Sequence, residues 1–281
     1  MRYLLYTPLS GKEKQSITEA EYYEVLSNIP AKLVDMTKLA NLRDFFEWLN
    51  PCDDVIVFGD DGTLNKVANA LVDCFIQNDI YYFPCGTCND FARDIDACNV
   101  QIPVLINDYI KSLPTVTVKG EQCKFINGVG FGIDGYCCEV GDLLKSQCKK
   151  PNYTTIAIKG LLFYFKPRNA TVDVDGRTYH FKKVWIAPTM FGRFYGGGMM
   201  PTPDQNRLAA DKKVSLMVFH NAGKFKTLAI FPSLFKGKHV KYTNVVQFHQ
   251  GKEITVSFDR PTALQVDGEV IRDVLSYTVH C

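Results

Sequence analysis

The chain has 281 residues, of which 12% are aromatic and 22% are charged, and its formal net charge is +2 at pH 7. This length and composition predict a folded, soluble protein with one large domain or two domains. The small net charge gives no support to nucleic acid as a partner. No apolar run approaches the ~18 residues needed to span a bilayer, and the apolar stretch at the N-terminus is too short for a signal peptide. We therefore expect a cytoplasmic protein.

The first part of the chain alternates between apparent strands and apparent helices. The elements expected in order are a strand at Tyr3–Tyr6, a polar loop from Thr7 to Lys12, a helix from about Ile17 to Ile29, a strand near Leu33–Asp35 and a helix from about Leu42 to Leu49. Thr37 lies at the end of the second strand, where a helix cap and a position in a ligand site are equally good interpretations.

The most informative stretch begins at Asp54 and ends at Leu71. The unbroken apolar run Val55–Phe58 predicts a strand that is buried on both faces and stops at Gly59. A helix follows directly, because its apolar residues recur at i, i+3, i+4 and i+7. The Gly-Asp-Asp-Gly-Thr turn at residues 59–63 therefore sits at a helix N-terminus, where backbone N–H groups favour phosphate. Gly and Asp also dominate ordinary turns, so this turn alone does not identify a nucleotide site.

A second loop of the same kind strengthens the nucleotide interpretation. Residues 84–93 follow an apolar strand at Ile80–Phe83 and open another helix. Strands that alternate with helices to about residue 113 predict a parallel sheet with helices on both faces. Ligands bind such sheets at the carboxyl ends of the strands, which is where both loops would lie.

From Thr115 onward the pattern changes to apparent strands with fewer helices. Strands are expected at Thr115–Val118, Cys123–Ile126, Val184–Ala187, Val214–Phe219, Asn244–Phe248, Ile254–Phe258 and Ala263–Val266, with a hairpin that turns at Asp175-Gly176. Helices are expected at Tyr136–Cys148 and Tyr153–Phe165. The second helix is rich in apolar side chains, which we interpret as core, with a lipid-facing wall as the alternative.

The ten cysteines are scattered over apparent core and helix positions, which favours reduced thiols. Cys85 and Cys88 form one C-x-x-C pair, a pattern found in redox pairs and in half of a zinc site. No second pair completes four ligands, and the adjacent Cys137 and Cys138 fit such a site poorly. Redox chemistry and zinc binding are therefore disfavoured.

The two loops together resemble the motifs G-G-D-G-T-x-N and P-x-G-T-x-N-D of the diacylglycerol kinase catalytic-domain family of lipid kinases. The first motif is shared with NAD kinases and phosphofructokinases, whereas the pair is fairly specific. The segments that also match the family, in its order, are Pro8 with Ser10 and Gly11, Asn127–Gly135, Tyr195–Met199 before Pro203-Asp204, and Val266–Glu269. Asp267-Gly268 also fits a plain hairpin turn.

The resemblance, joined to the patterns above, implies an α/β protein of two domains. Residues 1–114 would form a parallel-sheet nucleotide-binding domain with flanking helices, and residues 115–281 a mainly antiparallel β-sandwich domain that binds the substrate. The implied activity is transfer of a phosphoryl group from ATP, with Mg²⁺, to a diacylglycerol-like lipid. Phosphoryl transfer asks a protein mainly for positioning and charge neutralisation.

The resemblance also implies site residues. The nucleotide-binding candidates are Thr7, Gly11, Thr37, Gly59, Gly62, Thr63, Asn65, Gly86, Thr87 and Asn89. The amides of Gly59, Gly62 and Thr63 would cradle phosphates, and Asp61 would engage Mg²⁺ or the transferring group. Asp267 and Glu269 would accept the proton of the acceptor hydroxyl, with Asp134 nearby by family analogy. Asp211 is the remaining candidate ligand for a structural magnesium.

The implied partners are a nucleotide and a lipid taken from the membrane surface. Such a lipid is reached by peripheral contact at the inner face of the membrane, without a spanning helix. A homodimer stays open, and nucleic acid is not expected. Two other functions also stay open: a nucleotide-binding protein without catalysis, and an NAD kinase, whose downstream substrate motif finds no match in this chain.

Several residues depart from the family pattern. Asp60 replaces a Gly, Lys66 a Glu, Cys88 a Gly and Phe191 an Asn. The acidic D-D-G that holds a structural magnesium in some members survives only as Ala210-Asp211-Lys212, so we expect such an ion to bind weakly or not at all. A carboxylate at Asp60 would repel phosphate unless Mg²⁺ lies between them. We therefore expect Asp60 to point away from the phosphates or to bind them through Mg²⁺.

Overall fold

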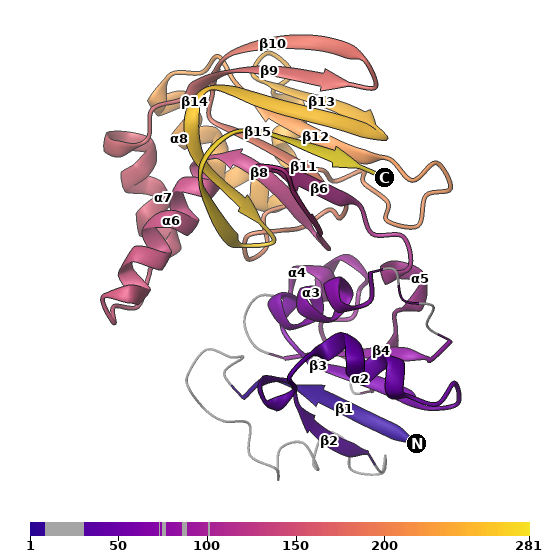
Figure 1. The fold of residues 1–281 in the computed structure, drawn as a ribbon. Helices are drawn as coiled ribbons and strands as arrows, with labels where there is room; N and C mark the ends of the chain where they lie inside the picture. Colours follow the sequence, from indigo (N-terminus) through magenta and orange to yellow (C-terminus); the bar gives the residue numbers. More distant parts are fainter. Residues whose placement is uncertain (9–30, 73, 75–76, 86–88, 101) are drawn as a thin grey trace. The chain divides into compact units, whose positions relative to one another are not determined.

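The computed structural model describes residues 1–8, 31–72, 74, 77–85, 89–100 and 102–281. The chain forms two compact units, unit 1 at Met1–Ser112 and unit 2 at Leu113–Cys281, as drawn in Figure 1. The units divide between Ser112 and Leu113, whereas the sequence placed the boundary after residue 114. The helix expected from about Ile17 to Ile29 lies outside the described residues.

Unit 1 is built on a five-stranded sheet with the order β2-β1-β3-β4-β5. Its strands are β1 (Arg2–Tyr6), β2 (Lys32–Asp35), β3 (Asp54–Gly59), β4 (Ile80–Pro84) and β5 (Val104–Leu105). The first four strands pair in parallel, with β3 in the centre, and Val55 and Val57 are fully buried there. The short β5 pairs antiparallel with β4 at one edge, which the sequence did not predict.

The helices that the structure describes in unit 1 differ in how they begin, because only some of them have a side-chain cap. They are η1 (Met36–Lys38), α2 (Leu42–Trp48), α3 (Asp61–Ala70), α4 (Asp90–Asp94) and α5 (Asn107–Ile110). The Asn41 side chain caps α2 by accepting the amide of Arg43 at 2.9 Å, a typical N-cap contact. Helix α3 starts directly after β3, as predicted, and buries Leu64, Val67 and Ala68.

Unit 2 contains a ten-stranded sheet in which every pairing is antiparallel. The strands are β6 (Thr115–Val118), β7 (Glu121–Lys124), β8 (Gly128–Gly132), β9 (Arg168–Val174), β10 (Arg177–Val184), β11 (Ile186–Met190), β12 (Val214–Phe219), β13 (Val246–Gly251), β14 (Glu253–Val266) and β15 (Glu269–His280). The predicted turn at Asp175-Gly176 is confirmed, because both residues have positive φ between β9 and β10.

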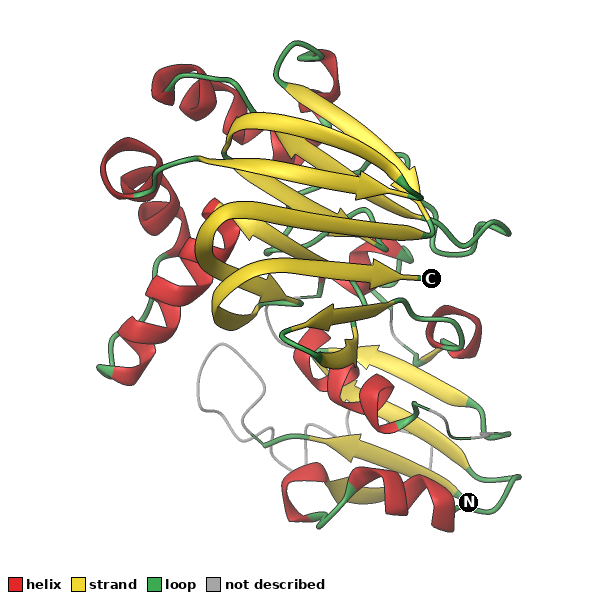
Figure 2. Ribbon diagram, turned by 45° about the horizontal axis from the view of Figure 1, so that its top comes forward, coloured by secondary structure: helices red, strands yellow, loops and turns green. Residues whose placement is uncertain are grey.

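The long strand β14 joins two parts of this sheet, and its curvature is visible in Figure 2. Its first residues pair with β9 and its last residues pair with β8. The sequence predicted two strands here, Ile254–Phe258 and Ala263–Val266. The structure keeps one strand and instead shifts its register with β15 between Ser257 and Thr262. Phe131 of β8 stacks on Phe258 of β14, with ring centroids 4.6 Å apart.

The helices of unit 2 are α6 (Ile133–Ser146), α7 (Tyr153–Lys159), η2 (Gly160–Tyr164), α8 (Lys224–Ile230), η3 (Phe231–Lys236) and η4 (Lys238–Lys241). Ile156, Leu161 and Phe165 are buried, so the core interpretation of their segment is confirmed for these residues. Phe163 and Tyr164, in the same segment, are 69% and 65% exposed. Among the described residues, no helix is both long enough and apolar enough to cross a bilayer.

Candidate active site

The two loops of unit 1 are joined by the carboxylate of Asp61. This side chain is buried at the first residue of α3. It accepts the backbone N–H groups of Asp90 at 2.8 Å and of Phe91 at 3.2 Å, which open α4. Because an acidic side chain stabilises a helix N-terminus, the first loop supplies the cap for the helix of the second loop. The two sequence motifs therefore form one structure.

Asp60 occupies the N-terminus of α3 itself. Its Oδ1 accepts the Thr63 amide and the Thr63 hydroxyl, both at 3.1 Å. The sequence assigned the Thr63 amide to a phosphate cradle, whereas in this structure Asp60, a strong N-cap residue type, accepts that amide. The Asp60 carboxylate is thus directed at the start of its own helix.

The two glycines of this turn play different roles. A Cβ on Gly59 would lie 2.5 Å from Cβ and Oγ1 of Thr63, so only glycine fits there. The Gly59 carbonyl accepts the Tyr82 hydroxyl at 3.0 Å. Gly62 is exposed, and a Cβ there would meet nothing closer than Asp60 Oδ1 at 3.5 Å. Gly59 is therefore required by packing, whereas Gly62 leaves open space above the turn.

The other nucleotide candidates of unit 1 follow the parallel strands. Thr7 follows β1, and the Thr37 hydroxyl donates to Asp35 at 2.7 Å just after β2. Because β1 pairs in parallel with β2 and β3, these residues and Gly59 lie at the same edge of the sheet. Asn65 lies on α3 and accepts the Asn69 amide at 3.1 Å, and Asn89 precedes α4.

Gly11, Gly86 and Thr87 lie outside the described residues, as does Cys88 of the C-x-x-C pair. Burial raises the pKa of the Cys85 thiol to about 12, with the Asp60 carboxylate adding to the shift. A thiol with this pKa is protonated at neutral pH and is a poor nucleophile or metal ligand. The nine cysteines that the structure describes in detail are free thiols.

In unit 2 the Asp267-Gly268 pair forms the tight turn between β14 and β15, with φ values of 47° and 91°. The Asp267 carboxylate accepts three backbone N–H groups, from Ile126 at 2.6 Å, Asn127 at 2.8 Å and Gly128 at 3.0 Å. The hairpin interpretation of the sequence is therefore correct, and the carboxylate is also held in one orientation. Glu269 starts β15 and is exposed.

The segment that Asp267 holds is also bound by Arg207. This guanidinium is only 4% exposed and donates to the Ile126 carbonyl and, at 2.6 Å, to Asn127 Oδ1. It also lies over the Phe191 ring, 5.7 Å from the centroid. The sequence analysis missed Arg207, because an Arg in a polar loop carries no local signal of burial.

Asp134 is a buried carboxylate that connects two further motifs. It lies in the first turn of α6, and its Oδ2 accepts the Tyr195 hydroxyl at 3.2 Å. Among the described residues, its Oδ1 has no hydrogen-bond partner. Burial raises the pKa of Asp134 to about 6, and hydrogen bonds from the Gly135 backbone and the Tyr195 hydroxyl oppose this shift. Tyr195 precedes three glycines that all have positive φ, which explains why the triple glycine is needed.

Asp211, the candidate magnesium ligand, forms an ion pair with a nearby lysine. Its side chain is 54% exposed and pairs with Lys213 at 3.3 Å. Within the described ranges, no three His, Cys, Asp or Glu side chains gather closely enough to hold an ion. Because Mg²⁺ takes several oxygen ligands in near-octahedral geometry, these residues do not fit a structural magnesium.

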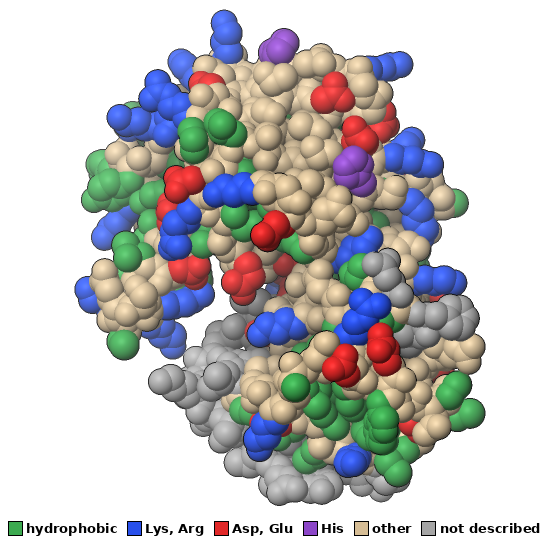
Figure 3. All heavy atoms as spheres, viewed as in Figure 1, with side chains coloured by type: hydrophobic (Ala, Val, Ile, Leu, Met, Phe, Trp, Pro, Cys, Tyr) green, Lys and Arg blue, Asp and Glu red, His purple; other side chains and the backbone are tan. Residues whose placement is uncertain are grey.

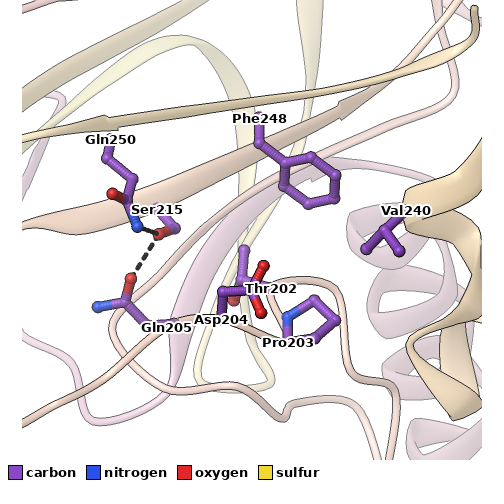
Figure 4. A pocket seen from close by; sticks show the side chains of 8 residues that line it. All are labelled: Thr202, Pro203, Asp204, Gln205, Ser215, Val240, Phe248 and Gln250. Carbon is purple, nitrogen blue, oxygen red and sulfur yellow. Dashed lines mark hydrogen bonds between the residues drawn. The ribbon is translucent and has the colours of Figure 1, made fainter. Parts of the chain in front are cut away.

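Unit 2 also contains a cavity of about 470 Å³, shown in Figure 4. It is lined by Thr202, Pro203, Asp204, Gln205, Ser215, Val240, Phe248 and Gln250. The Ser215 hydroxyl donates to Gln205 at 2.5 Å and accepts from Gln250 at 2.9 Å. These polar groups satisfy one another, and none of the site residues predicted from the sequence lines the cavity.

Comparison with protein families assigns each half of the chain. Residues 2–118 match the diacylglycerol kinase catalytic domain. Residues 127–279, more than half of the chain, match the YegS C-terminal NAD kinase beta sandwich-like domain. The two matches follow the order of the two units.

Individual relatives support the same assignment. A putative lipid kinase, YtlR, from Bacillus subtilis is 25% identical over 77% of this chain and 74% of its own length. A diacylglycerol kinase from the same organism is 25% identical over 95% of this chain and 88% of its own length. The crystal structure of a putative diacylglycerol kinase from Bacillus anthracis has the same fold, with a TM-score of 0.65 at 17% identity over 99% of this chain and 93% of that one.

The different roles of Gly59 and Gly62 are testable by stability. Gly59→Ala should lower the free energy of unfolding by about 1–3 kcal/mol, because the added methyl group overpacks against Thr63. Gly62→Ala is the matched control and should raise stability by about 0.5–1 kcal/mol, since alanine is favoured in a helix and the space is open. Urea unfolding measures both. Equal effects of the two variants would contradict the assigned roles.

The raised pKa of Asp134 predicts that the stability of the folded protein depends on pH. Its pKa is about 3.9 in an unfolded chain and about 6 in the folded protein, so the folded state binds this proton more tightly. The stability that the folded protein gains from this tighter proton binding is present below about pH 4 and is lost as the pH rises through about 6. Asp134→Asn should therefore gain up to about 3 kcal/mol of stability relative to the native chain between pH 4 and pH 7.

The measurement is urea unfolding of both proteins at several pH values. Tyr195→Phe should steepen the loss of stability with pH, because it removes the hydrogen bond that favours the charged carboxylate. A difference between native chain and Asp134→Asn that stays constant from pH 4 to pH 7 would show that this carboxyl group titrates normally.

Proposed function

Because the chain belongs to the diacylglycerol kinase catalytic-domain family of lipid kinases, we propose that it transfers the γ-phosphoryl group of ATP to the hydroxyl of a diacylglycerol-like membrane lipid. The observation that carries this proposal is the contact between the two loop motifs of unit 1. Asp61 of the first motif holds the amides of Asp90 and Phe91, which open α4 at the end of the second motif, so the two motifs lie together beyond the carboxyl ends of β3 and β4. Ligands of parallel sheets bind at the carboxyl ends of the strands.

The proposed nucleotide site uses the strand ends of unit 1. Thr7, Thr37 and Gly59 lie at one edge of the sheet, and the exposed Gly62 leaves room there for a phosphate chain. The Thr63 amide is held by Asp60, so phosphate contacts fall to other groups of the loops. ATP, when bound, supplies the phosphoryl group. The described residues offer no magnesium cluster, so we assign no step to a metal held by the protein.

Proton acceptance is proposed for the acidic turn of unit 2. Three backbone amides fix the Asp267 carboxylate, and a general base has to be held in a defined orientation. Glu269 is exposed two positions further along and is the second candidate. Asp134 is buried and carries a proton more readily than an ordinary carboxyl group, which suits a hydrogen bond to the lipid hydroxyl.

A nucleotide-binding protein without catalysis is the second candidate function, and Asp60 is the observation that favours it. Its carboxylate occupies the α3 N-terminus, which would otherwise attract phosphate. An unscreened phosphate ~4 Å from this carboxylate would be repelled by about 4 kcal/mol at an effective dielectric of ~20. Because the carboxylate is directed at its own helix, we expect the lipid kinase to be active.

The deciding experiment incubates the purified chain with radiolabelled ATP and a panel of lipids: diacylglycerol, phosphatidylglycerol, ceramide and polyprenol. Labelled lipid supports the kinase, and label on NAD in a parallel reaction would indicate an NAD kinase. Asp60→Gly should change the rate only slightly, because glycine is also an acceptable N-cap. Activity that appears only in Asp60→Gly would show that the native chain is a non-catalytic relative.

The open space at Gly62 predicts that Gly62→Val weakens ATP binding. The branched side chain would project above the turn, and loss of one phosphate contact, about 1.4 kcal/mol, would lower affinity about tenfold. Titration calorimetry measures the affinity. Gly223→Val is the matched control, because Gly223 also has open space around it but lies in unit 2. Unchanged ATP affinity in a folded Gly62→Val protein would move the phosphates away from this turn.

The turn that contains Asp267 and Glu269 predicts that Asp267→Asn and Glu269→Gln differ in their effects on the rate of lipid phosphorylation and on stability. Asp267→Asn should lower the rate of lipid phosphorylation by about 10²–10⁴ if its carboxylate is the base. It should also lower stability by about 1–3 kcal/mol, because the amide side chain cannot accept all three backbone N–H groups. Glu269→Gln should leave stability unchanged at its exposed position.

Rates and urea unfolding are measured for both variants at saturating ATP. A large loss of rate in Glu269→Gln, with Asp267→Asn impaired in stability alone, would assign the base to Glu269 and leave Asp267 a structural role.

A further inference from the structure

The net charge of +2 hides a strong separation of charge along the chain. Residues 143–168 and 220–241 contain 11 Lys and Arg residues and no Asp or Glu. The remainder of the chain has 21 basic and 30 acidic residues. The basic residues of these segments are Lys145, Lys149, Lys150, Lys159, Lys166, Arg168, Lys224, Lys226, Lys236, Lys238 and Lys241. Both segments belong to unit 2, and they carry α7, η2, α8, η3 and η4.

The same segments expose large apolar side chains. Phe225, in the first turn of α8, is 83% exposed, and Phe163 and Tyr164 of η2 are 69% and 65% exposed. Exposed aromatic residues this large are unusual on a soluble protein unless they mark a binding surface. We call these three residues, with Lys159, Lys166, Lys224 and Lys226, the aromatic-basic face.

The two parts of this face are in direct contact. The Lys224 ammonium donates to the Leu162 carbonyl at 2.9 Å, which ties the start of α8 to η2. The Phe163 and Tyr164 rings are neighbours, with centroids 6.3 Å apart. Figure 3 shows hydrophobic and Lys or Arg side chains side by side along the edge of unit 2 where Figure 1 places α7.

The aromatic side chains are held outward by the packing beneath them. Leu161 and Phe165, on either side of the exposed pair, are buried in the core of unit 2 with Ile230 of α8. Gly160 has no room for a Cβ, because the Tyr136 ring of α6 would lie 2.7 Å away. Phe163 and Tyr164 therefore cannot turn inward without displacing a filled core.

We propose that the aromatic-basic face docks the protein onto an anionic lipid bilayer, with Phe163, Tyr164 and Phe225 inserted at the headgroup level and the lysines against lipid phosphates. Aromatic rings favour the membrane interface, and each lysine near an anionic surface adds attraction. The choice of a bilayer rests on the proposed function, because a kinase for a membrane lipid must reach its acceptor at that surface. Exposed aromatic rings and lysines also suit single-stranded nucleic acid, which the experiment includes as a competitor.

The experiment sediments the intact protein, without nucleotide, with sucrose-loaded vesicles of phosphatidylcholine alone or mixed with phosphatidylglycerol. The native chain should bind the mixed vesicles and release from them as salt rises, because salt screens charge attraction. Phe163→Ser and Phe225→Ser should each lower the partition coefficient about tenfold. Lys159→Gln and Lys226→Gln should each lower it about fivefold.

Matched controls lie elsewhere on unit 2. Leu275→Ser removes an apolar side chain that is 52% exposed on β15, and Lys182→Gln and Lys252→Gln remove exposed lysines outside the two basic segments. None of these should change vesicle binding. Thermal unfolding should be the same for all variants, since every changed side chain is exposed.

A second measurement separates this inference from the proposed function. Phe163→Ser and Phe225→Ser should keep the native rate on a short-chain, water-dispersed diacylglycerol and lose rate on diacylglycerol held in vesicles. Native protein that does not bind the mixed vesicles, or that binds them equally after both phenylalanine changes, would overturn the docking face even if the kinase is active. Tight binding to a single-stranded oligonucleotide with no vesicle binding would overturn it too. Vesicle binding that depends on both phenylalanines, with no lipid phosphorylated, would support the face and reject the kinase.

Discussion

Carboxylates that accept backbone N–H groups hold the candidate residues of each unit in shape. In unit 1 the buried Asp61 takes the two amides that open α4, and this contact fixes one loop against the other. In unit 2 Asp267 takes three consecutive amides at the start of β8. A charged acceptor makes each of these bonds stronger than a neutral one, so the loops have little freedom to separate.

The same chemistry explains how the chain accommodates its unusual Asp60. A carboxylate beside a phosphate site is unfavourable, whereas a carboxylate at a helix N-terminus is favourable. By capping α3 through Thr63, Asp60 gains a stabilising partner and is turned toward its own helix. The cost is one amide that would otherwise be available to an anion. An acidic residue in this motif is thus compatible with a folded loop, and its effect on catalysis depends on where the phosphates lie.

The overall net charge of this protein does not describe the charge of its separate regions. The overall balance is nearly neutral, yet the surface around η2 and α8 is basic and carries exposed aromatic rings. Arg207 shows the opposite case, since it is a buried cation that grips the Ile126 carbonyl and the Asn127 side chain. Arg207 therefore contributes to the interior of unit 2, whereas the basic residues around η2 and α8 contribute to its surface.

The strand-turn-helix elements, the two-part organisation and the order of the motifs could be predicted from the sequence, because periodicity and turn chemistry are local properties of a chain. The β3–α3 unit and the turns at Asp175-Gly176 and Asp267-Gly268 could all be predicted in this way. The groups that each side chain contacts could not be predicted, because they depend on how distant segments pack together. Asp267 accepts the amide of Asn127, which is 140 residues away in the sequence. Arg207 also contacts Asn127, so its burial depends on a segment far from it in the sequence. Leu161 and Phe163 are equally apolar and two positions apart, yet one is buried and the other exposed, because the side of η2 that faces the core is set by packing against α6 and α8.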